Sequence, residues 1–110
     1  MNITLSKVDK ALIASVEGRL DAETSSDMET QLNEAIEKER SSLILDLDHL
    51  EYISSAGLRV ILSLAKKVKT SGKAFMLCSL QDSVEQVFEI SGFVGIMKIV
   101  ADKEAALGQI

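Results

Sequence analysis

The sequence predicts an α/β domain whose mixed sheet is mostly parallel and is connected by helical crossovers. Two observations support this fold class. Short apolar segments alternate with amphipathic segments from the first helix onward, and the 110-residue chain is 46% hydrophobic. Alternating strands and helices build parallel sheets, and a chain of this length and composition can bury one core. We therefore expect a single domain over residues 1–110, without an internal repeat or linker.

The first two expected strands are residues 3–8 and 11–16, which the polar pair Asp9 and Lys10 joins. Each is short and apolar, with imperfect alternation in the first, which is typical of a hairpin. Residues 18–21 then break the pattern.

A helix is expected next, because apolar residues recur at helical spacing. They are Met28, Leu32, Ala35 and Ile36. Residues 26–29 (SDME) read as a capping box, whereas Thr24 or Asp21 would cap an earlier start. The charged run 37–40 ends the helix and reads as a solvated face.

Residues 43–47 are apolar apart from Asp46, as expected of a central strand that is covered on both faces. Residues 46–55 follow as a polar strand-to-helix loop. A second helix then begins, because apolar residues again recur at helical spacing. They are Leu58, Ile61, Leu62, Ala65 and Val68. Gly72 is placed to end this helix.

Residues 73–80 contain another apolar run and read as a buried strand. Residues 82–85 (DSVE) would cap a third helix, which residues 91–93 stop. The side chains expected to face inward from this helix are Val84, Val87 and Phe88. A last strand at 96–100 and a short terminal helix at 102–107 complete the pattern.

Composition excludes several functions. Seventeen acids against twelve bases give a net charge of −5, which repels nucleic-acid backbones. The first five residues, MNITL, lack the basic start and the apolar middle of a signal peptide, and no apolar run approaches the ~20 residues needed to cross a bilayer. We therefore expect a cytoplasmic protein that binds neither nucleic acid nor membrane. The single Cys78 lies in an apolar strand, where it is expected to pack.

The sequence predicts neither a metal site nor a bound cofactor. One Cys and one His supply almost none of the usual transition-metal ligands. Neither of the glycine-rich nucleotide-binding motifs, GxGxxG and GxxxxGK[ST], occurs.

Ser54 and Ser55 stand at the expected start of the second helix, in a loop at the carboxyl end of a strand, where α/β sheets tend to bind ligands. A serine hydrolase would need the GxSxG pattern, which is absent, and a base. His49 is the only histidine, and it lies too near in sequence for the usual triad. We therefore expect no catalytic residue and no enzyme, and a small serine hydrolase is the least favoured alternative.

A phosphate on either serine would suit the start of a helix. Phosphorylation adds about −1.5 to −2 charges, and the N–H groups of a first helical turn can receive a phosphate. Against a partner's packed or acidic surface, the same charge would repel. The residues alone leave two interpretations open: a phosphorylation switch and an ordinary serine cap.

Three segments closely resemble the STAS domain family of bacterial anti-sigma factor antagonists. They are GRLDAET at residues 18–24, LDLDHLEYISSAGLR at residues 45–59 and FEISGF at residues 88–93. The resemblance covers nearly the whole chain, and the middle motif is the specific one. It implies one STAS domain over residues 1–110, similar to the soluble antagonists rather than to the STAS tails of anion transporters.

The resemblance implies a partner-switching cycle. In that family, the unphosphorylated antagonist binds an anti-sigma factor that is also a serine kinase, and this releases the sigma factor. The kinase then phosphorylates the antagonist, which dissociates, and a PP2C-type phosphatase resets it. The alternative is a STAS interaction or scaffold module in another signalling or lipid-transport complex.

The family pattern places the modified serine two positions before the Gly57-Leu58 pair, which implies Ser55. Many members have Asp before this serine and Ser or Thr after it, where this chain has Ser54 and Ala56. Ser54 is therefore a competing acceptor of the phosphate.

Two charged residues, Asp21 and Arg59, are further candidates for partner binding. Asp21 matches the family's GxLD motif, whose region faces the kinase, and it could equally cap the first helix. Arg59 lies four residues after Ser55 and would pair with the phosphate or meet an acidic kinase surface. The predicted partner-binding residues are thus Asp21, Ser54, Ser55, Gly57, Leu58 and Arg59.

Overall fold

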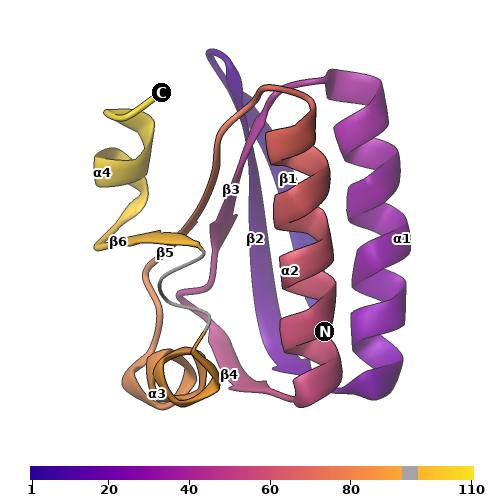
Figure 1. Ribbon diagram of the computed structural model, residues 1–110, viewed down its shortest axis with the longest axis vertical. Coiled ribbons are helices and arrows are strands. Elements are labelled where there is room, and N and C mark those ends of the chain that lie inside the picture. Colours follow the sequence, from indigo (N-terminus) through magenta and orange to yellow (C-terminus); the bar gives the residue numbers. More distant parts are fainter. Residues whose placement is uncertain (93–96) are drawn as a thin grey trace.

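A six-stranded mixed sheet and four helices form the part of the chain that the computed structural model describes, residues 1–92 and 97–110 (Figure 1). In chain order the elements are β1 (Asn2–Val8), β2 (Ala11–Leu20), α1 (Ala22–Glu39), β3 (Ser42–Asp46), β4 (Leu50–Ile53), α2 (Ser55–Thr70), β5 (Phe75–Cys78), α3 (Asp82–Ser91), β6 (Lys98–Val100) and α4 (Lys103–Leu107).

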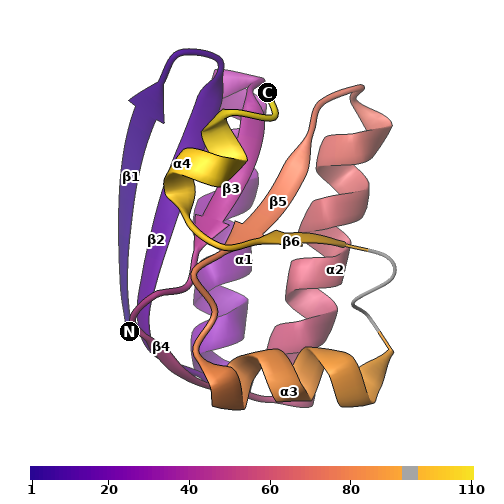
Figure 2. The ribbon, with the colours of Figure 1, turned by 90° about the vertical axis from the view of Figure 1, so that its left-hand side faces the viewer.

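The strand order is β1-β2-β3-β5-β6, and β4 pairs with the far end of β2. β1 and β2 form an antiparallel hairpin, whereas every other pair of strands in the described residues is parallel. α1 and α2 cover one face of the sheet, and α4 lies on the opposite face (Figures 1 and 2). The predicted α/β class, with a mostly parallel sheet and helical crossovers, is confirmed.

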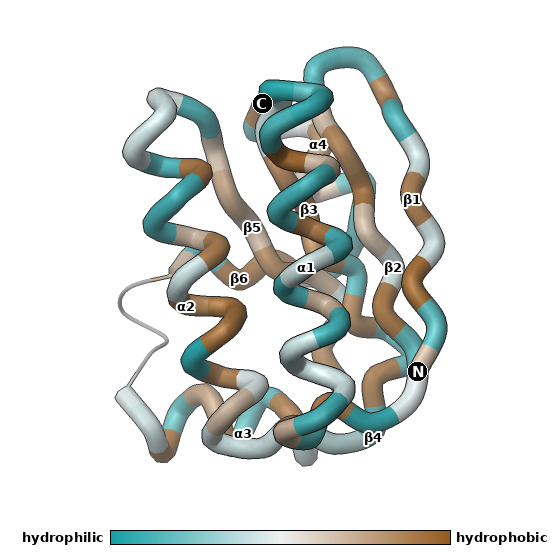
Figure 3. The backbone as a smooth tube through the Cα atoms, turned by 90° about the vertical axis from the view of Figure 1, so that its right-hand side faces the viewer, coloured by the Kyte–Doolittle hydropathy of each residue, from teal (hydrophilic) through white to brown (hydrophobic). Residues whose placement is uncertain are grey.

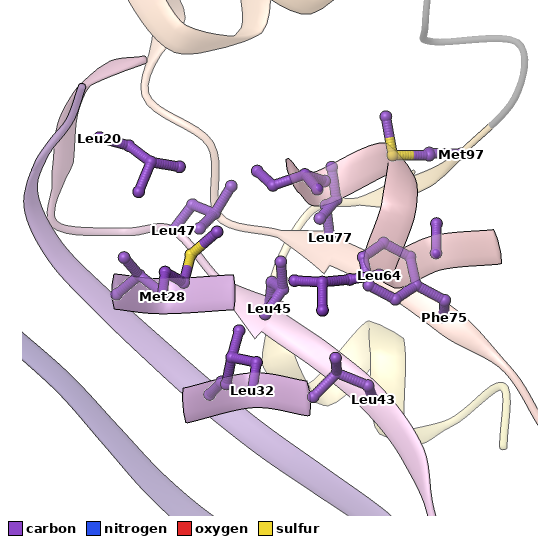
Figure 4. Close-up of a cluster of buried hydrophobic side chains, with 14 of the residues drawn as sticks. Leu20, Met28, Leu32, Leu43, Leu45, Leu47, Leu64, Phe75, Leu77 and Met97 are labelled. Carbon is purple, nitrogen blue, oxygen red and sulfur yellow. The ribbon is translucent and has the colours of Figure 1, made fainter. Parts of the chain in front are cut away.

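The larger core lies between the sheet and the pair α1 and α2. Leucines of β3 and β5 meet Met28 and Leu32 of α1 and Leu64 of α2 (Figure 4). Polar and apolar residues alternate along α2, as its one buried face requires (Figure 3). A smaller apolar cluster joins the other face of the sheet to α4 through Ala106. None of the described helices is long and apolar enough to cross a membrane.

The predicted break of the second strand at residues 18–21 was wrong, because β2 continues to Leu20. Val16 and Leu20 are buried while Glu17 and Arg19 are exposed, so the strand alternation persists across the glycine. Gly18 has a φ of 104° and stands where the pairing with β4 shifts register. The glycine therefore stands at the register shift without ending the strand.

The expected loop at residues 46–55 contains a strand, β4, which the sequence analysis missed. β2 and β4 pair as Gly18 with Leu50 and Arg19 with Tyr52, so Glu51 is an extra residue in β4. Leu50 and Ile53, three positions apart, are consequently both buried. A bulge of this kind hides the period-two pattern by which a strand is recognised.

Helix boundaries account for the other differences. α1 begins one turn earlier than residues 26–29, because Asp21 and Thr24 form its capping box, the earlier alternative. The predicted cap at residues 82–85 was wrong, since the N-cap of α3 is Gln81, which makes no side-chain capping bond. On α2, Leu64 is buried where Leu62 had been expected.

The remaining predicted elements are found: β3 has the predicted length but lies one residue earlier than 43–47, and the strands expected at 73–80 and 96–100 are shorter. Gly72 and Gly92 both have positive φ just beyond a helix, as expected of helix-ending glycines. The predicted roles of Phe93 and Ile96 lie outside the described residues.

Candidate functional site

The two serines at the start of α2 have different environments. Ser54 is the N-cap, and its Oγ accepts a hydrogen bond from the Gly57 backbone N–H at 3.1 Å. Ser55 is the first helical residue and is exposed. Among the residues that the structure describes, none forms a hydrogen bond with the Ser55 hydroxyl. The cap and the accessible hydroxyl are thus supplied by two neighbouring residues.

One backbone hydrogen bond joins the serines to the loop that carries Asp21. The N–H of Ser54 donates to the carbonyl of Leu20 at 2.9 Å. Asp21 and Ser54 follow the last residues of β2 and β4, and these two strands are parallel neighbours. Carboxyl ends of adjacent parallel strands meet at one edge of a sheet, so Asp21 lies beside the serines.

Asp21 caps α1 while remaining exposed. Its Oδ1 accepts a hydrogen bond from the Thr24 backbone N–H at 2.9 Å, and the Thr24 hydroxyl accepts one from the Asp21 N–H. The Thr24 N–H is the largest cause of a lowered pKa at Asp21, and the Thr24 side chain adds to it. The structure therefore shows the capping role of Asp21, and a partner contact stays a prediction.

Gly57 and Leu58 pack behind the serines. A Cβ atom at Gly57 would lie 2.9 Å from Cγ1 of Ile53 and 3.0 Å from Cγ of Leu20, which is too close for any side chain. Leu58 is 6% exposed. These two residues seat the start of α2 against β2 and β4, and the prediction that they touch a partner remains untested.

Arg59 lies four residues after Ser55 on α2 and is exposed. Residues at this spacing share one face of a helix. Within the described part of the chain, Arg59 forms no ion pair. Its guanidinium is therefore available to a phosphate at Ser55 or to a partner's carboxylate.

Sequence reasoning missed two residues at this edge, Arg19 and Tyr52. The guanidinium carbon of Arg19 lies 4.3 Å from the centre of the Tyr52 ring, a cation–π contact between β2 and β4. Both side chains are exposed. The two side chains meet only because β4 pairs with β2. Since the sequence analysis did not predict β4, it could not predict this contact.

His49 and Asp46 have structural contacts. The backbone carbonyl of His49 accepts from the Gly18 N–H at 3.0 Å, and its ring Nε2 lies 3.6 Å from the Asp48 carboxylate. The buried carboxylate of Asp46 accepts from the Ser15 hydroxyl at 3.2 Å. No hydrogen bond connects His49 with either serine among the described residues, so a hydrolase gains no support.

The model of the STAS domain family matches residues 2–106. The chain belongs to the STAS domain family. This STAS chain is 40% identical over 106 residues to BtrV of Bordetella bronchiseptica, a provisionally named anti-sigma factor antagonist, with 96% of this chain and 91% of BtrV covered. It is 31% identical to the anti-sigma F factor antagonist of Paenibacillus polymyxa, with 90% and 86% covered.

Solved structures share the STAS fold. A provisionally named anti-sigma factor antagonist of Thermotoga maritima aligns with a TM-score of 0.91 at 24% identity, covering 98% of this chain and 93% of that one. Bacillus SpoIIAA in its phosphorylated form aligns with a TM-score of 0.74 at 17% identity, covering 98% of each chain. At these identities the likeness establishes the fold.

Proposed function

We propose that this STAS domain is a cytoplasmic anti-sigma factor antagonist that binds an anti-sigma factor with serine kinase activity. Phosphorylation of Ser55 releases that partner, and a PP2C-type phosphatase restores binding, so that sigma-factor-dependent transcription is regulated by partner switching. The observation that carries the proposal is the exposed Ser55 hydroxyl at the first position of α2. Relatives at 40% and 31% identity that are named as antagonists support it.

Ser55 is favoured over Ser54 as the phosphate acceptor. The Ser54 oxygen already accepts a hydrogen bond from Gly57 and is half-buried, whereas a kinase must bring the acceptor hydroxyl to the phosphate of ATP. A phosphate at Ser55 would also sit at the positive end of the α2 dipole. The domain would then stay folded while its surface charge changes.

The size of the required effect indicates where Ser55 lies in the complex. Moving a partner from almost fully bound to almost fully free requires about 5.5 kcal/mol of differential affinity. An exposed ion pair contributes roughly 0–1 kcal/mol. Ser55 should therefore be covered by the partner, where a phosphate would be desolvated and repelled.

The test uses a candidate kinase, a histidine-kinase-like ATPase from the same genome, sought first among the genes that neighbour this one. Incubation with ATP followed by mass spectrometry should find one phosphate, on Ser55, and none on Ser55→Ala. In titration calorimetry, Ser55→Asp should bind the kinase far more weakly than the wild type while keeping its fold. Equal affinities of the wild type and Ser55→Asp would contradict the switch, and kinase binding without phosphate transfer would favour a scaffold role.

A further inference from the structure

We propose that Arg19 and Tyr52 form a second contact with the kinase beside Ser55. In this contact, Arg19 pairs with an acidic side chain of the kinase, and the Tyr52 ring takes a neighbouring apolar side chain. The inference rests on the proposed function and extends the predicted binding surface to two residues of the 18–24 and 45–59 segments to which the sequence analysis assigned no role.

The two side chains form one unit across two strands. Arg19 of β2 and Tyr52 of β4 are register partners, and the guanidinium carbon lies 4.3 Å from the ring centre. Their neighbours in the strands, Leu20 and Ile53, are buried in the core. Because strand side chains alternate, Arg19 and Tyr52 point outward, and Tyr52 is 40% exposed.

The unit lies within reach of a partner seated on Ser55. Arg19 is two residues before Asp21, and Tyr52 is three residues before Ser55. At about 3.3 Å per strand residue, these separations are about 7 and 10 Å. A standard interface buries about 800 Å² per partner, which corresponds to a disc of about 16 Å radius. A kinase centred on Ser55 would therefore extend over the pair.

The contact between Arg19 and Tyr52 makes the pair suitable for binding a partner. Tyrosine and arginine are among the residues most enriched at energetic centres of interfaces. A cation–π contact at an exposed site contributes about 0.5–1 kcal/mol, so it favours one arrangement of the two side chains before a partner arrives and lowers the entropy lost on binding. An exposed tyrosine on a short strand has no core-packing role that would explain its position.

The charges of Arg19 and Asp21 indicate which charged side chains the partner should carry. Arg19 forms no ion pair with any described residue, and the carboxylate of Asp21 lies two residues further on. A complementary surface would place an acid opposite Arg19 and a base opposite Asp21, a pattern that selects among partners. The exposed carboxylates of Glu17 and Glu51 flank the pair. They would repel an acidic side chain of the partner from every nearby position except the one opposite Arg19.

The experiment measures binding of the same candidate kinase to four variants by calorimetry and stopped flow. Tyr52→Ala should weaken binding about tenfold or more through faster dissociation. Arg19→Ala should slow association about fivefold and reduce its salt dependence. Tyr52→Phe keeps the ring, and Arg40→Gln removes an arginine at the opposite end of the sheet; both should stay within about twofold of the wild type. In phosphorylation assays, the first two variants should raise KM and leave kcat within about twofold.

The outcomes separate this inference from the proposed function. Wild-type affinity in both Arg19→Ala and Tyr52→Ala, with Ser55→Asp still impaired, would overturn the inference alone. A wild-type chain that binds no kinase would overturn the proposed function and with it this contact. If urea unfolding shows that Tyr52→Ala is destabilised, Arg19→Ala decides, because Arg19 is exposed and its loss leaves the core intact.

Discussion

The Oγ of Ser54 lies 3.1 Å from the backbone nitrogen of Gly57, whereas the hydroxyl of the adjacent Ser55 is exposed. Two serines that look alike in the sequence thus differ in what each contributes. Ser54 stabilises the start of α2, and Ser55 leaves its oxygen accessible. Their substitution should therefore change different measured quantities.

Ser54→Ala should lower the free energy of unfolding by about 1 kcal/mol, because an unsatisfied helix N-terminus replaces the cap. Ser55→Ala, the matched control, should change it by less than about 0.5 kcal/mol. Urea unfolding followed by circular dichroism measures both. A larger loss in Ser55→Ala than in Ser54→Ala would contradict the assignment of the cap.

Gly57→Ala should destabilise the domain although alanine is the better helix former. The added Cβ would stand 2.9 Å from Ile53 and 3.0 Å from Leu20, and overpacking costs roughly 1–3 kcal/mol. The gain in helix propensity is only about 0.5–1 kcal/mol. We expect a net loss of about 1 kcal/mol, and at most about 2.5 kcal/mol, in chemical denaturation.

The control for Gly57→Ala is Ser63→Ala, on the exposed face of the same helix. It should leave the unfolding free energy within about 0.5 kcal/mol of the wild type. A stabilised Gly57→Ala would show that the backbone of α2 moves away from β4 at little cost.

Asp21→Asn should remove a pH-dependent part of the stability. Hydrogen bonds from Thr24 lower the pKa of Asp21 in the folded state, so the ionised carboxylate stabilises the fold above the unfolded pKa of about 3.9. This contribution is lost as the pH falls through the folded pKa. Because asparagine also caps helices, the difference in melting temperature between the two proteins should shrink from pH 6 to pH 3. If the melting temperatures of the two proteins change in parallel between pH 6 and pH 3, the Asp21 carboxylate does not supply this pH-dependent stability.

Cys78 should resist thiol reagents in the folded protein. Its side chain is fully buried, and burial raises its pKa to about 11. At pH 8 the thiolate fraction is then about 200-fold smaller than for a free cysteine of pKa about 8.5. Reaction with a chromogenic disulfide should be slow until urea unfolds the chain. Rapid modification under native conditions would show that α4 opens readily from the sheet.

Regular patterns in the sequence predicted most of the fold. The helical spacing of Met28, Leu32 and Ile36 and the apolar run of β3 each report directly on one buried face. Such local periodicity is enough to assign α1, α2 and the central strands. The positions of Gly72 and Gly92 likewise indicated the helix ends.

The features that the sequence analysis did not predict depend on pairing between strands that are far apart in the sequence. β4 has its apolar residues three apart because Glu51 is an extra residue opposite β2, and no window of the sequence contains that register. Arg19 and Tyr52 are 33 positions apart, so their contact exists only through the strand pairing. Ser55 was identified from the family motif, whereas its exposure and the capping bond of Ser54 required the structure.

The pairing of β2 with β4 also governs when the site comes into existence during synthesis. α1 and β3 separate the two strands along the chain, so Asp21 and Ser55 become neighbours only after the segment up to α2 has emerged and folded. A peptide of residues 46–60 contains the serines but neither Asp21 nor the β2 backbone that holds Ser54. A partner that contacts Asp21 and Ser55 together would therefore not bind a nascent or misfolded chain in which β2 and β4 are unpaired.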